Sequence, residues 1–128
     1  MKKSITLLLI AAFLTTLFVV SCSKKDDDKK NYSELIVGRW KTADGGHYEV
    51  YNTDGTGKMW DPADDVEEDE ADIFDWSIDN KNKMTQLIHF QGGQGDVSQY
   101  CNIIILNETT LKYDNNGWRA EYTLTRVN

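Results

Sequence analysis

The chain has 128 residues, of which 21 are acidic and 14 basic, giving a formal net charge of −7. An acidic surface repels nucleic-acid phosphates and anionic lipid headgroups, so this charge argues against DNA and RNA as partners. The length, with 40% hydrophobic residues and Pro62 as the single proline, suits one small folded domain rather than two domains joined by a linker.

The first 21 residues have the features of an export signal. A basic start, Met1–Lys3, precedes an uncharged apolar run of 16 residues from Ile5 to Val20. As a helix this run would be about 24 Å long, which is short for a hydrocarbon core of about 30 Å. The Val-Val-Ser-Cys sequence that ends at Cys22 looks like a lipobox, the motif at which bacterial lipoproteins are cut and acylated. The resemblance implies that residues 1–21 are removed and that Cys22 carries the lipid (for example palmitate) that anchors the chain in the membrane. The alternative is an ordinary secretory signal with an incidental cysteine.

Residues 22–31 form a charged segment that contains four lysines, three aspartates and no residue able to build a core. We therefore expect a disordered tether between the lipid and the domain. The segment resembles the acidic tag with which some Gram-negative bacteria send lipoproteins to the outer leaflet, which implies an outer-membrane protein exposed at the cell surface. The alternative is a plain spacer on a periplasm-facing lipoprotein. Because only Lys2 and Lys3 leave with the signal, 12 basic and 21 acidic residues remain, a net charge of −9.

From Leu35 onward the polarity of the sequence alternates with a period of two, which indicates strands. The alternation is strict in Phe74–Asp79 and recurs in Tyr48–Val50 and Leu111–Tyr113, whose apolar side chains are expected to face the core. No window of helical length has a 3.6-residue apolar period, apart from a short turn at 32–36. Turn-forming Asn, Asp and Gly separate the alternating segments. The pattern predicts eight strands, near residues 36–43, 46–52, 56–60, 72–79, 83–91, 96–106, 109–114 and 117–127.

Eight short strands joined mainly by hairpins predict an all-β fold, a small antiparallel up-and-down barrel over residues 32–128. Closing the meander into a barrel is expected to remove its exposed strand edges.

A family resemblance supports this fold. Gly38–Trp40 matches the Gly-x-Trp opening of lipocalins, and the Asp54–Gly57 turn and the closing segment Tyr122–Val127 resemble the lipocalin-like domain of bacterial lipoproteins. The resemblance spans nearly all of the predicted barrel. It implies that Trp40 closes one barrel end and that Arg126 packs over it, a structural role. The alternation agrees, because Arg126 falls on the apolar face of the last strand, where a charged group needs an aromatic face and carbonyl oxygens.

Eight-stranded barrels range from interiors filled by side chains to cups that hold one small ligand, and this domain is short for a full lipocalin. The first hypothesis is a non-enzymatic barrel that buries a small apolar or amphipathic ligand against inward aromatic side chains. The alternative is an interaction module of an envelope protein complex, with a filled barrel and an acidic contact loop. The aromatic residues that would either line the cup or fill it are Phe74, Trp76, Phe90, Trp118 and Tyr122.

The acidic segment 61–75 contains nine carboxylates and no basic residue. Like charges repel, so we expect an extended, mobile loop that faces solvent or a basic partner. Calcium prefers oxygen ligands, but the EF-hand pattern fails because Glu70 stands where its glycine is required. Metal binding is thus a secondary hypothesis, with Asp64, Asp65, Glu67 and Asp69 as the candidate ligands.

Other residues with reactive side chains lack a catalytic context. His47 and His89 fall on the polar phase of strands and are expected at the surface, and no Cys/His spacing supplies a zinc site. The glycine-rich segment Gln91–Asp96 joins two strands, so it lacks the helix N-terminus that binds phosphate. Cys101 lies in an apolar strand and is expected to be a small buried residue. We therefore expect neither an enzyme nor a bound cofactor.

Overall fold

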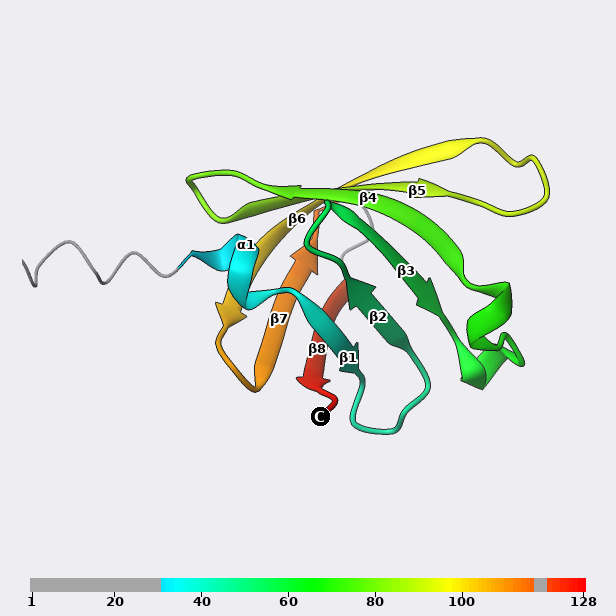
Figure 1. The fold of residues 1–128 in the computed structure, drawn as a ribbon, viewed down its shortest axis with the longest axis horizontal. Coiled ribbons are helices and arrows are strands. Elements are labelled where there is room, and N and C mark those ends of the chain that lie inside the picture. Colours follow the sequence, from blue (N-terminus) through cyan, green and yellow to red (C-terminus); the bar gives the residue numbers. More distant parts are fainter. Residues whose placement is uncertain (1–30, 117–119) are drawn as a thin grey trace, which may run out of the picture. The chain divides into compact units, whose positions relative to one another are not determined.

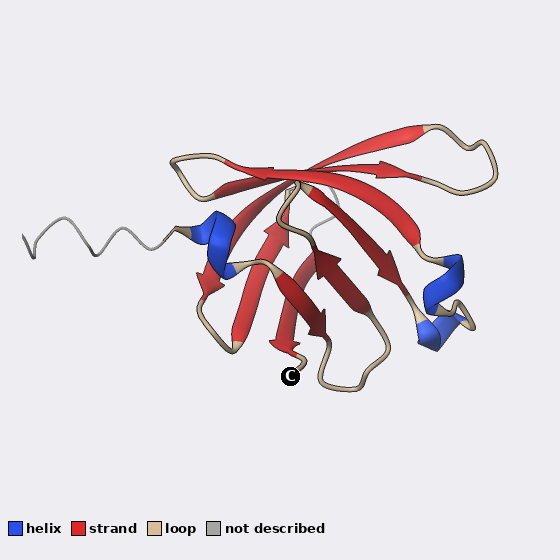
Figure 2. Ribbon diagram, viewed as in Figure 1, coloured by secondary structure: helices blue, strands red, loops and turns tan. Residues whose placement is uncertain are grey.

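The structure is a computed structural model, and it describes residues 31–116 and 120–128. Cys22 and Trp118 lie outside the described residues. Among those described, no helix is long and apolar enough to cross a membrane. The elements, shown in Figures 1 and 2, are α1 (Tyr32–Leu35), β1 (Gly38–Lys41), β2 (Tyr48–Tyr51), β3 (Thr56–Trp60), the 3-10 helices η1 (Pro62–Asp64) and η2 (Glu68–Glu70), β4 (Asp72–Ile78), β5 (Lys83–His89), β6 (Asp96–Leu106), β7 (Thr110–Asn115) and β8 (Ala120–Arg126).

The strands form a closed antiparallel barrel in the order β1 to β8, so the predicted all-β eight-stranded up-and-down fold is confirmed. Each strand pairs with its neighbours in sequence, because short turns allow only antiparallel partners. The seam between β1 and β8 has two pairs of opposing residues, Trp40 with Arg126 and Lys41 with Thr125, whereas β5 and β6 share seven. Apart from the start of β8, the strands begin and end within two residues of the predicted bounds.

Side chains from all eight strands occupy the barrel interior. Cys101 is among the buried residues, as predicted. On β3, Gly57 lies opposite Phe74, whose ring and the Val50 carbonyl fill the space that a Cβ atom would need. The fully buried side chains are Ile36, Trp40, Glu49, Tyr51, Phe74, Met84, Gln86, Ile88, Cys101, Leu111 and Leu124.

The alternating direction of the strands defines two ends of the barrel. The end that we call the α1 end carries α1, the turns after β2, β4 and β6, and the C-terminus. The other, the loop end, carries the connection 42–47, the acidic connection 61–71, the loop 90–95 and the last residues of β7. The β5–β6 hairpin projects beyond the rest of the barrel at the loop end (Figure 1).

Candidate functional site

A buried carboxylate lies inside the barrel towards the loop end. Glu49 is fully buried, and it accepts hydrogen bonds from the hydroxyl of Tyr51 (2.6 Å) and from the hydroxyl of Tyr113. The Nε2 atom of His47 lies 2.9 Å from Glu49 Oε1, and the Nε2 of Gln86 donates to the Tyr51 hydroxyl at 2.7 Å. We call these five residues the Glu49 cluster. Its hydrogen bonds and its histidine compensate the cost of removing a carboxylate from water.

The inward position of Glu49 corrects the predicted phase of β2. The expectation that Tyr48 and Val50 face the core is wrong, because Glu49 and Tyr51 point inward instead. Tyr48 stacks on Trp60 on the outer wall, with 5.0 Å between the ring centres. This outer pair is itself covered, and Trp60 is only 4% exposed. Alternation shows that the two faces of a strand differ in polarity. Where other side chains cover the outer wall, apolar residues can also be buried there, so the apolar face need not be the one that points inward.

His47 is also not the surface histidine that the sequence predicted. Its side chain is 15% exposed and lies between Glu49 and Asp61, whose Oδ1 atom is 2.6 Å from Nδ1. Burial lowers the pKa of His47, but the hydrogen bonds and charges of Glu49 and Asp61 outweigh burial and raise the pKa to about 9. The imidazole is therefore protonated at neutral pH, and both its N–H groups donate to carboxylates.

The tyrosine hydroxyls and the cysteine thiol of the interior hold their protons. Burial, followed by the charge of Glu49, raises the pKa values of Tyr51 and Tyr113 well above the usual range. Burial likewise raises the pKa of the Cys101 thiol to about 12. Groups in these protonation states donate hydrogen bonds, but they do not act as bases or nucleophiles at neutral pH. The Glu49 cluster can therefore hold its side chains in fixed orientations and balance the charge of Glu49 against that of His47.

Gln86 has one unusual feature within the Glu49 cluster. Its Oε1 atom is buried and has no hydrogen-bond partner among the described residues. Exchanging the amide oxygen and nitrogen would not give the oxygen a partner. The single hydroxyl proton of Tyr51 is already donated to Glu49, so the Tyr51 oxygen can only accept a hydrogen bond from the Gln86 amide nitrogen.

At the α1 end, the structure brings Trp40 and Arg126 together. The guanidinium carbon of Arg126 lies 4.2 Å from the centre of the Trp40 ring. The same guanidinium donates to the carbonyls of Val37 and Glu108, each at 2.7 Å, and to that of Leu35. The indole N–H of Trp40 donates to the carbonyl of Ile36 at 2.7 Å. Backbone carbonyls from both sides of the seam thus converge on one side chain.

The aromatic residues proposed to line a cup are dispersed. Phe74 lies in the core with its edge towards Tyr51, and Trp76 is partly buried, with its indole N–H donating to the Thr56 carbonyl at 2.9 Å. Tyr122 stacks on Tyr113, with 5.3 Å between the ring centres, and its ring centre lies 5.8 Å from that of His47. Phe90 is exposed in the loop after β5. Trp118 lies outside the described residues.

The acidic connection 61–71 is not the extended loop that the sequence predicted, because it contains η1 and η2. Glu68 of η2 forms ion pairs with Arg39 of β1 (2.7 Å) and Lys58 of β3 (2.6 Å), and these contacts hold the connection against the outer wall. The candidate metal ligands Asp64, Asp65, Glu67 and Asp69 are not gathered, and the described residues contain no group of three or more side chains arranged to hold a metal. Basic residues on β1 and on the preceding strand β3 therefore hold this connection in place, although the segment itself contains no basic residue.

His89 lies on the outer wall, as predicted, and bridges two carboxylates. Its Nε2 atom is 3.0 Å from Asp75 on β4, and its Nδ1 atom is 2.9 Å from Asp96 on β6. The hydrogen bonds that its ring donates to the carboxylates of Asp75 and Asp96 raise its pKa.

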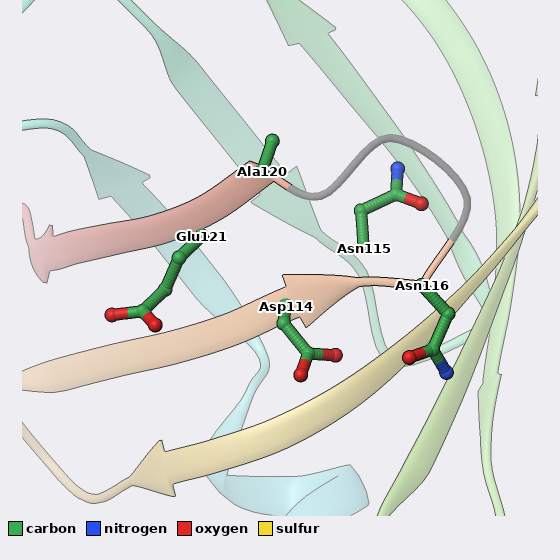
Figure 3. Close-up of a pocket in the computed structure, with 5 residues that line it drawn as sticks. All are labelled: Asp114, Asn115, Asn116, Ala120 and Glu121. Carbon is green, nitrogen blue, oxygen red and sulfur yellow. The ribbon is translucent and has the colours of Figure 1, made fainter.

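A shallow depression of about 280 Å³ lies on the surface where β7 ends and β8 begins (Figure 3). Its polar lining includes two carboxylates, Asp114 and Glu121, which sit opposite each other on β7 and β8. The remaining lining residues are Asn115, Asn116 and Ala120.

In comparisons with known proteins, no family model, no curated protein and no solved structure matches the chain.

Proposed function

We propose that this chain is an outer-membrane lipoprotein, anchored by a lipid on Cys22, whose lipocalin-like barrel is a non-enzymatic interaction module of an envelope protein assembly. The observation that supports an interaction module over a carrier is the occupied interior. Trp40, Phe74, Met84 and Leu124 are fully buried there and take the space that an apolar ligand would need. Recognition is then left to the outer surface and the loops.

The protonation states of the interior support a role without catalysis. His47 is charged between two carboxylates, and the hydroxyls of Tyr51 and Tyr113 donate to Glu49. Such a network fixes side chains and gives the core one arrangement, which suits a rigid scaffold that presents a binding surface.

A second candidate is binding of a small amphipathic molecule at the loop end. Phe90 and Val97 continue the inward phase of β5 and β6 but are 36% and 38% exposed, because the hairpin extends past the barrel. The two side chains offer exposed apolar surface on this hairpin, and such a site would take only part of a ligand.

Titration with the neutral apolar fluorophore N-phenyl-1-naphthylamine separates the two candidates. The filled barrel predicts no saturable binding by the purified lipoprotein and no small molecule co-purifying with it by mass spectrometry. Saturable binding at one probe per chain, lost in Phe90→Ser but kept in the outer-wall control Tyr100→Ser, would instead establish the ligand-binding role.

Metabolic labelling with radioactive palmitate tests the anchor. Cys22→Ser should abolish the label, and Cys101→Ser should keep it. Label that persists in Cys22→Ser would show that the processing site is misassigned. Protease added to intact cells should degrade a surface-exposed domain and leave a periplasmic one whole.

A further inference from the structure

Two consecutive isoleucines near the end of β6 face solvent. The register between β6 and β7 shifts between Ile103 and Ile105, so Ile104 is the extra residue of a β-bulge. Ile104 is 48% exposed and Ile105 is 41% exposed, whereas Ile103 packs against the core and Leu106 is buried. Strict alternation would turn one of any two neighbouring side chains inward. The bulge therefore places two apolar side chains together on the outside of the barrel, and we call Ile104 and Ile105 the isoleucine pair.

The isoleucine pair lies at the α1 end of the barrel. Strand β6 finishes at Leu106, and the turn that follows belongs to the same end as α1 (Figure 1). Asn31, just before α1, follows Cys22 by nine positions, and nine extended residues span at most about 30 Å. A lipid on Cys22 would therefore keep the α1 end within reach of the membrane surface.

The tether contains no apolar side chain that could pack against the isoleucine pair. Its residues 23–31 are serine, lysine, aspartate and asparagine only. An exposed apolar surface that the chain itself does not cover marks contact with a membrane or with another protein. The short tether favours the membrane, because it holds this surface near the bilayer.

Three lysines lie around the isoleucine pair. Lys112 on β7 is opposite the second isoleucine, and Lys83 on β5 is opposite Asn102, one step before the pair on the same face. Lys81 lies in the turn before β5, and the amide of Ile103 donates to a carbonyl of this turn at 3.1 Å. Apolar side chains flanked by lysines are typical of surfaces that enter the bilayer interface, where the ammonium groups stay among anionic headgroups.

Two carboxylates beside these lysines already have partners in the fold. Asp79 accepts the amide protons of Lys81 and Lys83 at 2.8 and 3.0 Å and so shapes the turn. Glu121 pairs with Lys112 at 2.5 Å. Lys81 and Lys83 are both exposed, and they supply the positive charge that a lipid surface would meet.

The distribution of charge along the barrel favours the same orientation. The acidic connection 61–71 places seven carboxylates at the loop end. The α1 end has fewer, and it also carries the exposed Lys81 and Lys83. An anionic membrane therefore repels the loop end more strongly and turns the α1 end towards itself. The carboxylates of α1 and of the turns at the α1 end are Glu34, Asp54, Asp79 and Glu108.

We infer that the isoleucine pair is a second membrane contact, which enters the headgroup region of the bilayer beside the lipid anchor while Lys81 and Lys83 meet anionic headgroups. The barrel then stands on its α1 end and presents its loop end, with the acidic connection, to partners. Two side chains bind a bilayer weakly, but the tether makes the contact effective by keeping them close to the surface. The inference rests on the proposed lipid anchor and adds the orientation of the domain.

The test attaches the fluorophore nitrobenzoxadiazole at Ile104→Cys in the mature lipoprotein, held in vesicles of phosphatidylethanolamine and phosphatidylglycerol. Cys101 is 1% exposed and should stay unlabelled, and the lipid blocks Cys22. Doxyl groups near the top of the acyl chains quench this fluorophore on contact. They should remove about half of the fluorescence at position 104. Replacing Ile105 by Ser in the labelled protein should reduce the quenching, because the remaining apolar side chain is lost.

Ile73→Cys supplies the matched control. Ile73 is 52% exposed on β4, but it lies near the loop end. The fluorophore should not be quenched there. Lys81→Glu combined with Lys83→Glu should lower the quenching at position 104 about twofold in the anionic vesicles, and much less in vesicles of phosphatidylcholine alone.

Two results would overturn the inference. Quenching at position 104 that is no greater than at position 73 would leave the isoleucine pair to a partner protein. Shielding of position 104 from aqueous iodide that rises with protein concentration, without vesicles, would mean that a second copy covers the pair. Palmitate labelling of the same samples separates this inference from the anchor. Label retained without quenching rejects the membrane contact alone, whereas loss of the label rejects the anchor and the contact with it.

Discussion

The side chains of His47 and Glu49, two residues apart in the sequence, meet inside the barrel with 2.9 Å between Nε2 and Oε1. Asp61 holds the other ring nitrogen, so a cation is fixed between a buried carboxylate and a half-exposed one. Buried charges of this kind are sensitive to the loss of either partner.

Replacing Glu49 by Gln should destabilise the domain by about 3 kcal/mol, because the charge of His47 loses its buried partner and an amide N–H₂ must face other donors. Urea denaturation followed by tryptophan fluorescence measures the change. Tyr113→Phe removes one hydrogen bond from the same carboxylate and should cost only about 1 kcal/mol. Equal stability of the wild type and Glu49→Gln would mean that the carboxylate is not buried with a charged partner.

The raised pKa of His47 predicts a dependence of stability on pH. The folded state binds this proton more tightly, with a pKa of about 9 against about 6.5 when unfolded. The stabilisation is therefore complete below about pH 6.5 and is lost as the pH rises to about 9. It amounts to about 3 kcal/mol.

The test compares unfolding free energies at pH 6 and pH 9.5 in three proteins. The wild type should lose stability between the two values, and His47→Gln should lose much less. His89→Gln, a change at an exposed histidine between Asp75 and Asp96, should behave nearly as the wild type. If His47→Gln lost as much unfolding free energy between pH 6 and pH 9.5 as the wild type, the pH dependence of stability would have to come from other groups.

Arg126→Lys should destabilise the domain by about 2 kcal/mol despite keeping the charge. A lysine ammonium does not stack on the Trp40 ring, nor does it reach three carbonyls with a planar fork. Thermal unfolding measures the effect. The matched control, Arg39→Lys, changes a half-exposed ion pair and should cost less than about 1 kcal/mol.

Gly57→Ala should destabilise the domain by about 2 kcal/mol, because its Cβ atom would collide with the Phe74 ring and the Val50 carbonyl. Phe74→Leu should lose stability on its own through the smaller core side chain. If the collision with the ring is the cause, the double variant should be more stable than the sum of the two single losses predicts. Additive losses would place the cause in the backbone instead.

Strand positions could be read from the sequence because turn residues interrupt an alternating pattern at regular spacing. Within β4, for example, every second side chain from Phe74 to Ile78 packs towards the core as the alternation predicts. The period alone does not say which face of a strand is inside, and β2 shows the consequence. Its inward side is polar because Glu49 finds partners on β2, β7 and the preceding loop, and no local pattern encodes such distant contacts.

The Glu49 cluster was missed for the same reason, although one signal was available. His47 and Glu49 share a phase with Tyr51, and a polar-polar-aromatic series on one face is unusual for an exposed wall. The folding of the acidic connection also depends on distant residues. Its shape follows from Arg39 and Lys58 on other strands, which hold Glu68 in place.

The seam between β1 and β8, with its two pairs of opposing residues, makes the stability of the barrel uneven around its circumference. Local opening is expected to begin there, since few backbone hydrogen bonds must break for the sheet to part. Arg126 spans this line of weakness and ties the end of β8 to the carbonyls of Leu35 and Val37 just before β1. The Arg126 side chain therefore holds β8 to the start of β1. Its loss should lower the free energy needed to open the β1–β8 pair more than the free energy needed to open strand pairs on the opposite side of the barrel.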